Sequence, residues 1–162
     1  MTPLGAGSST SASTARAAVE ESDDAGIRKV FDTHVFGAAE MIKAVLPGIR
    51  ARRSGAIVDV SSIGAQITPV GSGYYSAAKA ALEGLSDALR GELAPLDISV
   101  TIVEPGAVRT DFAGRSLTQS ATIIDDYADT AGKRRKEHDN EQEKGTSSER
   151  ESASDLCRAD RI

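Results

Sequence analysis

The stretch that decides the fold of this 162-residue chain is Ala56-Ile57-Val58-Asp59-Val60. This run is short, mostly apolar and β-branched, and it follows a Ser54-Gly55 breaker, which is typical of a buried strand in a parallel sheet. A second run of the same kind, Ile98-Ser-Val-Thr-Ile-Val103, is ended by Pro105-Gly106. Between the two runs, an amphipathic pattern from about Tyr74 to Leu93 predicts a long helix. Strand, helix and strand in this order predict a βαβ crossover, and therefore an α/β fold with a parallel sheet.

Another long helix is predicted ahead of the first strand. Its apolar residues recur at intervals of three and four, as expected for one face of a helix: Ile27, Val30, Phe31, Val35, Ala38, Met41, Ile42 and Val45. Ser22-Asp23-Asp24 offers N-cap residues, and Pro47 is expected to stop the helix because proline has no backbone N–H. The pattern predicts a helix over about residues 23–45.

Composition divides the chain into three parts. Residues 1–17 are mostly Ser, Thr, Ala and Gly, and residues 126–162 carry charges of both signs with few large apolar side chains. Neither part offers enough apolar surface to offset the entropy of ordering, so both are predicted to be disordered extensions. The basic run at 133–136 is expected to be solvated. Residues 18–125 carry the periodic pattern and form the predicted folded segment.

Charge and cysteine content exclude several classes of function. The 24 acidic side chains outnumber the 19 basic ones, which argues against a nucleic-acid-binding face;. No run approaches the ~20 apolar residues that cross a bilayer. The single Cys157 has no partner for a disulfide, and His34 and His138 have no metal-ligand spacing;. We therefore expect a cytoplasmic protein without a metal, membrane or nucleic-acid partner.

Three polar side chains form the candidate site. Ser62 follows the first strand at its carboxyl end, the edge where open α/β sheets bind ligands. Tyr75 and Lys79 lie four residues apart at the beginning of the 74–93 helix, so they share one face. A neighbouring ammonium favours the phenolate, so Lys79 is expected to lower the pKa of Tyr75 and make it a proton donor or acceptor. The alternative is that Tyr75 and Lys79 form a helix surface pair, and that Ser61 and Ser62 belong only to a turn at the strand end.

Over roughly residues 18–125 the chain resembles the short-chain dehydrogenases/reductases. Tyr75-Ser-Ala-Ala-Lys79 matches the family's YxxxK motif with Ser62 thirteen residues upstream, and Pro105-Gly-Ala-Val-Arg-Thr110 is similar to its PG-x-V-x-T segment. The resemblance implies a partial Rossmann-like fold and an NAD(P)-dependent oxidoreductase that interconverts an alcohol and a carbonyl by hydride transfer.

The resemblance also implies a role for each residue. Tyr75 is the acid/base, Lys79 lowers its pKa and grips the nicotinamide ribose, and Ser62 binds the oxygen of the substrate. His34 stands where the family has an Asn that positions a water in the proton relay, and a histidine can also donate and accept hydrogen bonds. The residues expected to lie along the nicotinamide end of the cofactor, besides Tyr75 and Lys79, are Pro105, Gly106, Val108 and Thr110.

The chain departs from the family in its amino-terminal part. The glycine-rich turn TGxxxGxG, which receives the cofactor's pyrophosphate at a helix N-terminus, is not in the sequence;. We therefore expect a truncated family member with impaired binding of NAD or NADP. The alternative hypothesis is a catalytically inactive fragment, or a module that associates through its helices. In the family, the helices that correspond to residues 23–45 and 74–93 pack against a neighbouring subunit, so a homo-oligomer is implied.

Overall fold

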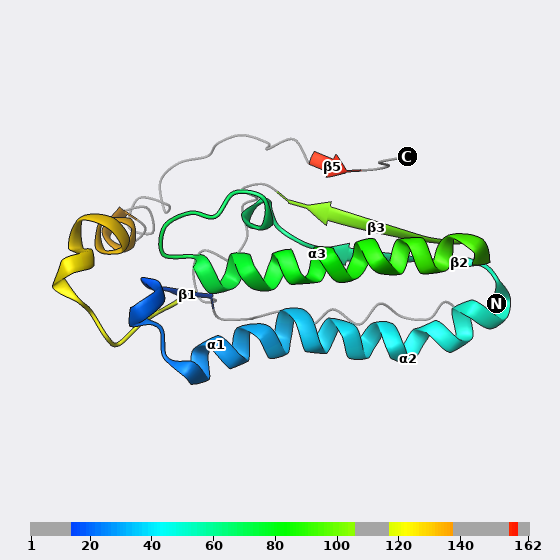
Figure 1. Ribbon diagram of the computed structural model, residues 1–162, viewed down its shortest axis with the longest axis horizontal. Helices are drawn as coiled ribbons and strands as arrows, with labels where there is room; N and C mark the ends of the chain where they lie inside the picture. Colours follow the sequence, from blue (N-terminus) through cyan, green and yellow to red (C-terminus); the bar gives the residue numbers. More distant parts are fainter. Residues whose placement is uncertain (1–13, 106–116, 138–155, 159–162) are drawn as a thin grey trace, which may run out of the picture.

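The computed structural model describes residues 14–105, 117–137 and 156–158. Strands β2 (Gly55–Val60) and β3 (Ile98–Glu104) pair in parallel, with Gly55 opposite Ile98 and Val60 opposite Val103. Helix α3 (Gly73–Leu93) joins the two strands and runs along the sheet (Figure 1). This arrangement confirms the predicted α/β fold with its βαβ crossover. The sequence did not predict β5 (Leu156–Arg158), which pairs antiparallel with β3 and completes the order β2-β3-β5.

The helix ahead of the sheet is longer than predicted. It begins as α1 (Asp24–Phe31), where the Asp23 side chain caps the Gly26 amide at 2.8 Å, and it passes through a π-helical segment (Asp32–Phe36) into α2 (Gly37–Arg52). The prediction that Pro47 ends this helix is wrong. Beyond the proline, Ile49 is buried in the core, and this burial favours continuation of the helix for another turn;. Arg53, in the left-handed region with φ 48°, ends the helix instead.

The main core lies between the helices and one face of the sheet. Its buried members come from α2, α3, β2 and β3: Ile42, Ile49, Ile57, Leu89, Leu93, Ile98 and Val100. The helix and the strand approach so closely that a Cβ at Gly55 would lie 2.5 Å from the Cγ2 of Ile49. Glycine is therefore required where α2 crosses the beginning of β2.

The other face of β2 is exposed, contrary to the predicted burial of this strand. Val58 and Val60 are 59% and 57% exposed, while Ile57 and Asp59, which alternate with them, are buried. Strand β2 carries apolar residues on both faces, as is typical of parallel strands, which usually lie between two layers. In the described part of the chain, only one of these layers covers it.

A second, smaller sheet lies beyond the beginning of α3. It pairs β1 (Thr14–Arg16) with β4 (Leu117–Gln119) in parallel. Short helical turns accompany the two sheets: Val19–Glu21, Ile63–Ala65, Ala94–Leu96, Asp125–Tyr127 and Ala128–Gly132. Residues 133–137 are also helical. Parts of both predicted extensions thus have regular structure, and the rest of the extensions lies outside the described residues.

Arg135 is the exception to the predicted solvation of the basic run at 133–136, whose other three residues are exposed. Its side chain is buried and forms an ion pair with Glu21 at 2.5 Å. The pairing partner lies more than a hundred residues away in the sequence, and local composition gives no signal for such a contact. None of the described helices combines the length and the apolar character that crossing a membrane requires.

Candidate active site

The end of β2 delivers Ser62 to the carboxyl edge of the sheet. The Ser61 amide donates to the Val103 carbonyl at 2.7 Å, which continues the strand pairing by one residue. Ser62 then begins a short helical turn, and its Oγ accepts a hydrogen bond from the Gly64 amide at 3.1 Å. The local turn therefore fixes the hydroxyl beside the start of α3.

Tyr75 is the residue around which the other three predicted site residues gather. A Cβ placed at Gly64 would lie 3.3 Å from Ser62 Oγ and 3.6 Å from Tyr75 Cε1, so both side chains border the same glycine. The His34 ring meets the Tyr75 ring edge to face, with centroids 5.4 Å apart and an interplanar angle of 83°. The structure thus brings together residues from the π-helical segment, the end of β2 and α3.

Lys79 lies beneath this cluster. Its Nζ is 5.9 Å from the centroid of the Tyr75 ring and donates a hydrogen bond to the Val60 carbonyl at 2.8 Å. Only 7% of the residue is exposed. The interpretation of Tyr75 and Lys79 as a helix surface pair is therefore wrong.

Burial governs the protonation of both residues. It raises the pKa of Tyr75 above its usual range, and hydrogen bonding with Ser62 only partly opposes this effect. Burial also lowers the pKa of Lys79, while the carboxylates of Asp59 and Glu83 oppose the shift. The expected lowering of the Tyr75 pKa by Lys79 is not found, because desolvation of the phenolate outweighs the ammonium at this separation.

One ring nitrogen of His34, Nε2, is buried and makes no hydrogen bond within the described part of the chain. Burial, with a smaller contribution from the Lys79 charge, lowers the pKa of the imidazole to about 4, so the ring is neutral at pH 7. π-Helical segments such as the one that carries His34 are frequent at functional sites.

The predicted cofactor-binding segment is described only at its beginning. Pro105 follows β3 directly, at the same edge of the sheet as Ser62, because Val103 pairs with Val60. The other predicted residues of this segment, Gly106, Val108 and Thr110, lie outside the described residues.

A buried polar network beside Lys79 was missed by the sequence analysis. Ser61 Oγ donates to Glu83 Oε1 at 2.5 Å, so Ser61 does more than end a strand. Ser86 Oγ donates to Asp59 Oδ2 at 2.7 Å. Two signals could have revealed the network: an aspartate among the apolar residues of a strand, and a glutamate four residues after Lys79 on the same helical face.

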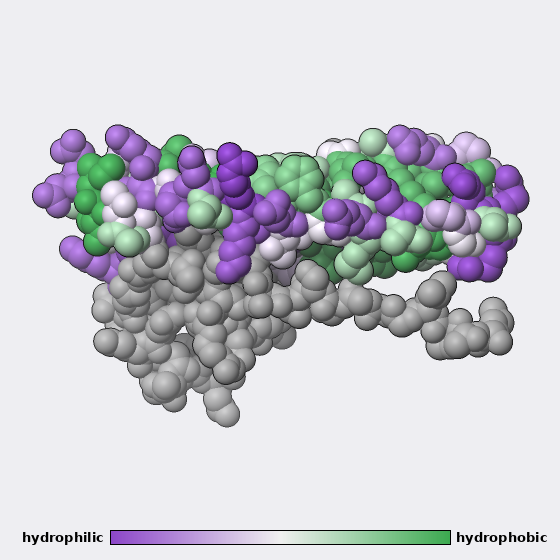
Figure 2. Space-filling model, turned by 90° about the horizontal axis from the view of Figure 1, so that it is seen from below, coloured by the Kyte–Doolittle hydropathy of each residue, from purple (hydrophilic) through white to green (hydrophobic). Residues whose placement is uncertain are grey.

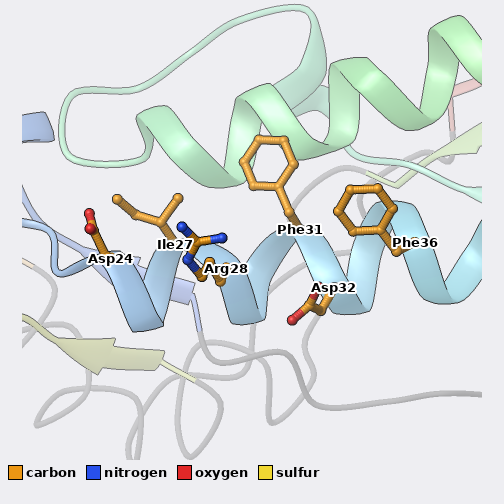
Figure 3. A pocket seen from close by; sticks show the side chains of 6 residues that line it. All are labelled: Asp24, Ile27, Arg28, Phe31, Asp32 and Phe36. Atoms are coloured by element: carbon orange, nitrogen blue, oxygen red, sulfur yellow. The ribbon is translucent and has the colours of Figure 1, made fainter.

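A separate hollow of about 450 Å³ lies along α1 and the π-helical segment (Figure 3). Its lining residues are Asp24, Ile27, Arg28, Phe31, Asp32 and Phe36. None of the predicted site residues lines it. The hollow therefore belongs to the helical surface and not to the cluster around Tyr75.

Comparison with known proteins identifies the family. The model of the short chain dehydrogenase family matches residues 5–121. Human retinol dehydrogenase 8 is 43% identical over 95 residues, which cover 59% of this chain and 30% of that protein.

Solved structures agree with this match. A short-chain dehydrogenase from Streptomyces avermitilis superimposes with a TM-score of 0.71 at 42% identity, over 78% of this chain and 48% of that one. NAD+-bound xylitol dehydrogenase is also similar, with a TM-score of 0.58 at 26% identity, over 60% of this chain and 38% of that one. ElxO with NADP bound has a TM-score of 0.59 at 27% identity, over 61% of this chain and 40% of that one. The chain spans less than half the length of each of these relatives, and it belongs to the short-chain dehydrogenase family.

Proposed function

We propose that this chain carries the catalytic centre of an NAD(P)-dependent oxidoreductase that interconverts an alcohol and a carbonyl compound. The observation that supports this most directly is the gathering of Ser62, His34 and Lys79 around the half-buried Tyr75. A phenol with a raised pKa is protonated at neutral pH. It can therefore give a proton to an oxygen that becomes negative as a carbonyl is reduced.

The other residues have supporting roles in this proposal. Ser62 holds the substrate oxygen beside the phenol, and Lys79 supplies a positive charge where the phenolate forms. The neutral His34 can accept or donate a hydrogen bond through its unpartnered Nε2, which suits a water that returns the proton to Tyr75. Each role depends on the polar atom being close to Tyr75 and sheltered from bulk water.

The residues at this edge fit the nicotinamide end of a cofactor. Lys79 offers a buried ammonium, and His34 offers a buried ring nitrogen with no partner in the described part of the chain. Tyr75, Lys79, Pro105, Gly106, Val108 and Thr110 would hold that end. When bound, the nicotinamide supplies or accepts the hydride. The sequence offers no glycine-rich turn for the pyrophosphate, so we expect NAD or NADP to bind weakly.

The test is the substitution Tyr75→Phe in the full chain. Reduction of a panel of aldehydes and ketones is followed by the loss of NADH or NADPH absorbance. Removing the proton donor is expected to slow reduction by about 10²-fold or more, as for other general acids. Tyr74→Phe is the matched control, since the exposed Tyr74 hydroxyl donates to the Val19 carbonyl at 3.4 Å, outside the cluster. The rate of this variant should stay close to that of the wild type. Undiminished reduction by Tyr75→Phe contradicts the role of Tyr75.

An association module is the second candidate function. It is favoured by apolar side chains that stay exposed on the long helices, among them Phe36 (58%), Met41 (44%) and Val45 (39%). Figure 2 views the molecule from below Figure 1, the side on which α1 and α2 lie, and shows hydrophobic surface over part of this side. The proposed partner is a second copy of the chain, paired through α1–α2 and α3. No turnover with either nicotinamide cofactor, together with stable self-association, would favour this function over catalysis.

A further inference from the structure

Two buried carboxylates lie beside Lys79, outside the four residues assigned to the site. Asp59 is 9% exposed and lies on β2, and Glu83 is 8% exposed and lies on α3. Tyr75, Lys79 and Glu83 follow one another at intervals of four residues, so they share one face of the helix. Asp59 directly precedes Val60, whose carbonyl accepts a hydrogen bond from Lys79 Nζ, so the two carboxylates come from two elements that both contact Lys79.

Neutral donors hold both carboxylates in place. Glu83 accepts hydrogen bonds from Ser61 Oγ at 2.5 Å and from Gln66 Nε2 at 2.7 Å, and Asp59 accepts one from Ser86 Oγ at 2.7 Å. Since these donors carry no charge, the negative charges of the two carboxylates are not neutralised by them. Lys79 is the cation whose charge they favour.

Lys79 needs such support because its surroundings disfavour a charge. The residue is 7% exposed, and its Nζ donates to a single identified acceptor, the Val60 carbonyl. A buried ammonium without nearby negative charge tends to lose its proton. Of the other titratable groups in this region, His34 and Tyr75 are neutral at pH 7, and Glu104 joins the network through Gln66 Nε2 at 3.5 Å.

We propose that Glu83 and Asp59 are positioning residues that keep Lys79 charged at the carboxyl end of β2, beside Tyr75. This inference rests on the proposed function, in which Tyr75 is the acid/base. In this proposal the two carboxylates need no contact with substrate or cofactor. They act through Lys79, because an uncharged amine would not stabilise the phenolate that forms when Tyr75 gives up its proton.

The test is a titration of Lys79 in the full chain by NMR of ¹³C-labelled lysine, with its signal identified by its loss in Lys79→Arg. In wild type, Lys79 is expected to be charged at pH 7. Glu83→Gln keeps the shape of the side chain and an oxygen for Ser61, but removes the charge. The pKa of Lys79 is then expected to fall by about 0.5–1 unit, at or below the lower end of what a nearby opposite charge contributes.

Asp87→Asn is the matched control for this variant. It also removes one carboxylate from α3, but the Asp87 side chain is 64% exposed and pairs with Arg90 on the surface. Solvent and salt screen such a charge, so the pKa of Lys79 should stay at its wild-type value. Circular dichroism of each variant verifies that it is folded. If Glu83→Gln does not fold, Asp59→Asn is titrated in its place.

Two results would overturn the inference. One is a Lys79 that is already uncharged at pH 7 in the wild-type chain. The other is a pKa of Lys79 in the folded Glu83→Gln or Asp59→Asn variant equal to that in Asp87→Asn. Neither readout requires catalysis, so failure here is distinct from failure of the proposed function, which the rate of Tyr75→Phe decides.

Discussion

His34 illustrates how a single buried side chain couples the candidate site to pH. The imidazole is packed edge to face against Tyr75, and its Nε2 has no partner in the described part of the chain. Burial lowers its pKa from 6.5 to about 4. Between these two values the unfolded chain binds a proton that the folded chain does not. The free energy of unfolding must therefore decrease as the pH falls through this range.

The substitution His34→Asn should remove this part of the pH dependence. Urea unfolding of wild type and variant, measured at several pH values from about 7 down to about 4.5, gives the two profiles. The wild-type profile is expected to fall more steeply below about pH 6.5, the unperturbed value for histidine. All other titrating groups are common to both proteins and cancel in the difference. Parallel profiles would mean that His34 titrates normally in the folded chain.

The sequence predicted which residues meet at the site better than it predicted their protonation. Ser62, Tyr75 and Lys79 come together because strand end, helix start and helix spacing are local properties of the sequence, whereas the place of His34 followed only from the family resemblance. The pKa of Tyr75 could not be predicted in this way. Its direction depends on how deeply three separate elements bury the phenol, and this is a property of the packed structure.

At the scale of elements, the Glu21–Arg135 ion pair joins the short helical turn ahead of α1 to the helical residues 133–137 that follow β4. Glu21 is 1% exposed and accepts hydrogen bonds from Arg135 Nη1 at 2.5 Å and Nη2 at 3.1 Å, and from the amides of Ala18 and Ile124. Arg135 is the main reason that the pKa of Glu21 falls to about 2. The stability that this carboxylate contributes is present above about pH 4.5, and it is lost as the pH falls from there toward 2.

Removing one partner should be costly because it leaves a buried charge unpaired. Arg135→Ala is expected to lower the free energy of unfolding by about 3 kcal/mol at pH 7, the lower end for broken buried ion pairs. Urea unfolding measures the loss. Arg134→Ala is the control, since Arg134 is 43% exposed and lies 3.6 Å from Glu137 on the surface. Its effect should stay below about 1 kcal/mol. Equal losses in the free energy of unfolding from the two substitutions would show that the buried pair stabilises the fold no more than the exposed pair does.

Periodicity predicted the helices and strands of the main core, and it erred where tertiary contacts outweigh local preference. Pro47 by itself predicts the end of a helix, but Ile49 is buried in the core because α2 continues past the proline;. The ion pair of Glu21 with Arg135 had no sequence signal, because nothing local distinguishes Arg135 from Arg134 beside it.

At the scale of the whole molecule, apolar surface remains exposed in two places. One is the helical face of α2 that carries Met41 and Val45, and the other is the outer face of β2 with Val58 and Val60;. Both elements were predicted from their apolar patterns, but a pattern does not say which of its faces is covered within the chain. Since exposed apolar patches favour association, either surface could hold two copies together.

We expect the helical face to be the contact, and Met41→Glu tests it. Met41 and Val45 lie one turn apart on α2, so a carboxylate at position 41 would have to be desolvated inside such an interface. Sedimentation velocity over a range of concentrations should find that wild type associates and that Met41→Glu shifts toward the monomer. Lys43→Gln changes the net charge equally on another side of the same helix, and it should associate like wild type. A wild type that is monomeric throughout contradicts the prediction. Dissociation by Val58→Lys and not by Met41→Glu would instead assign the contact to the sheet.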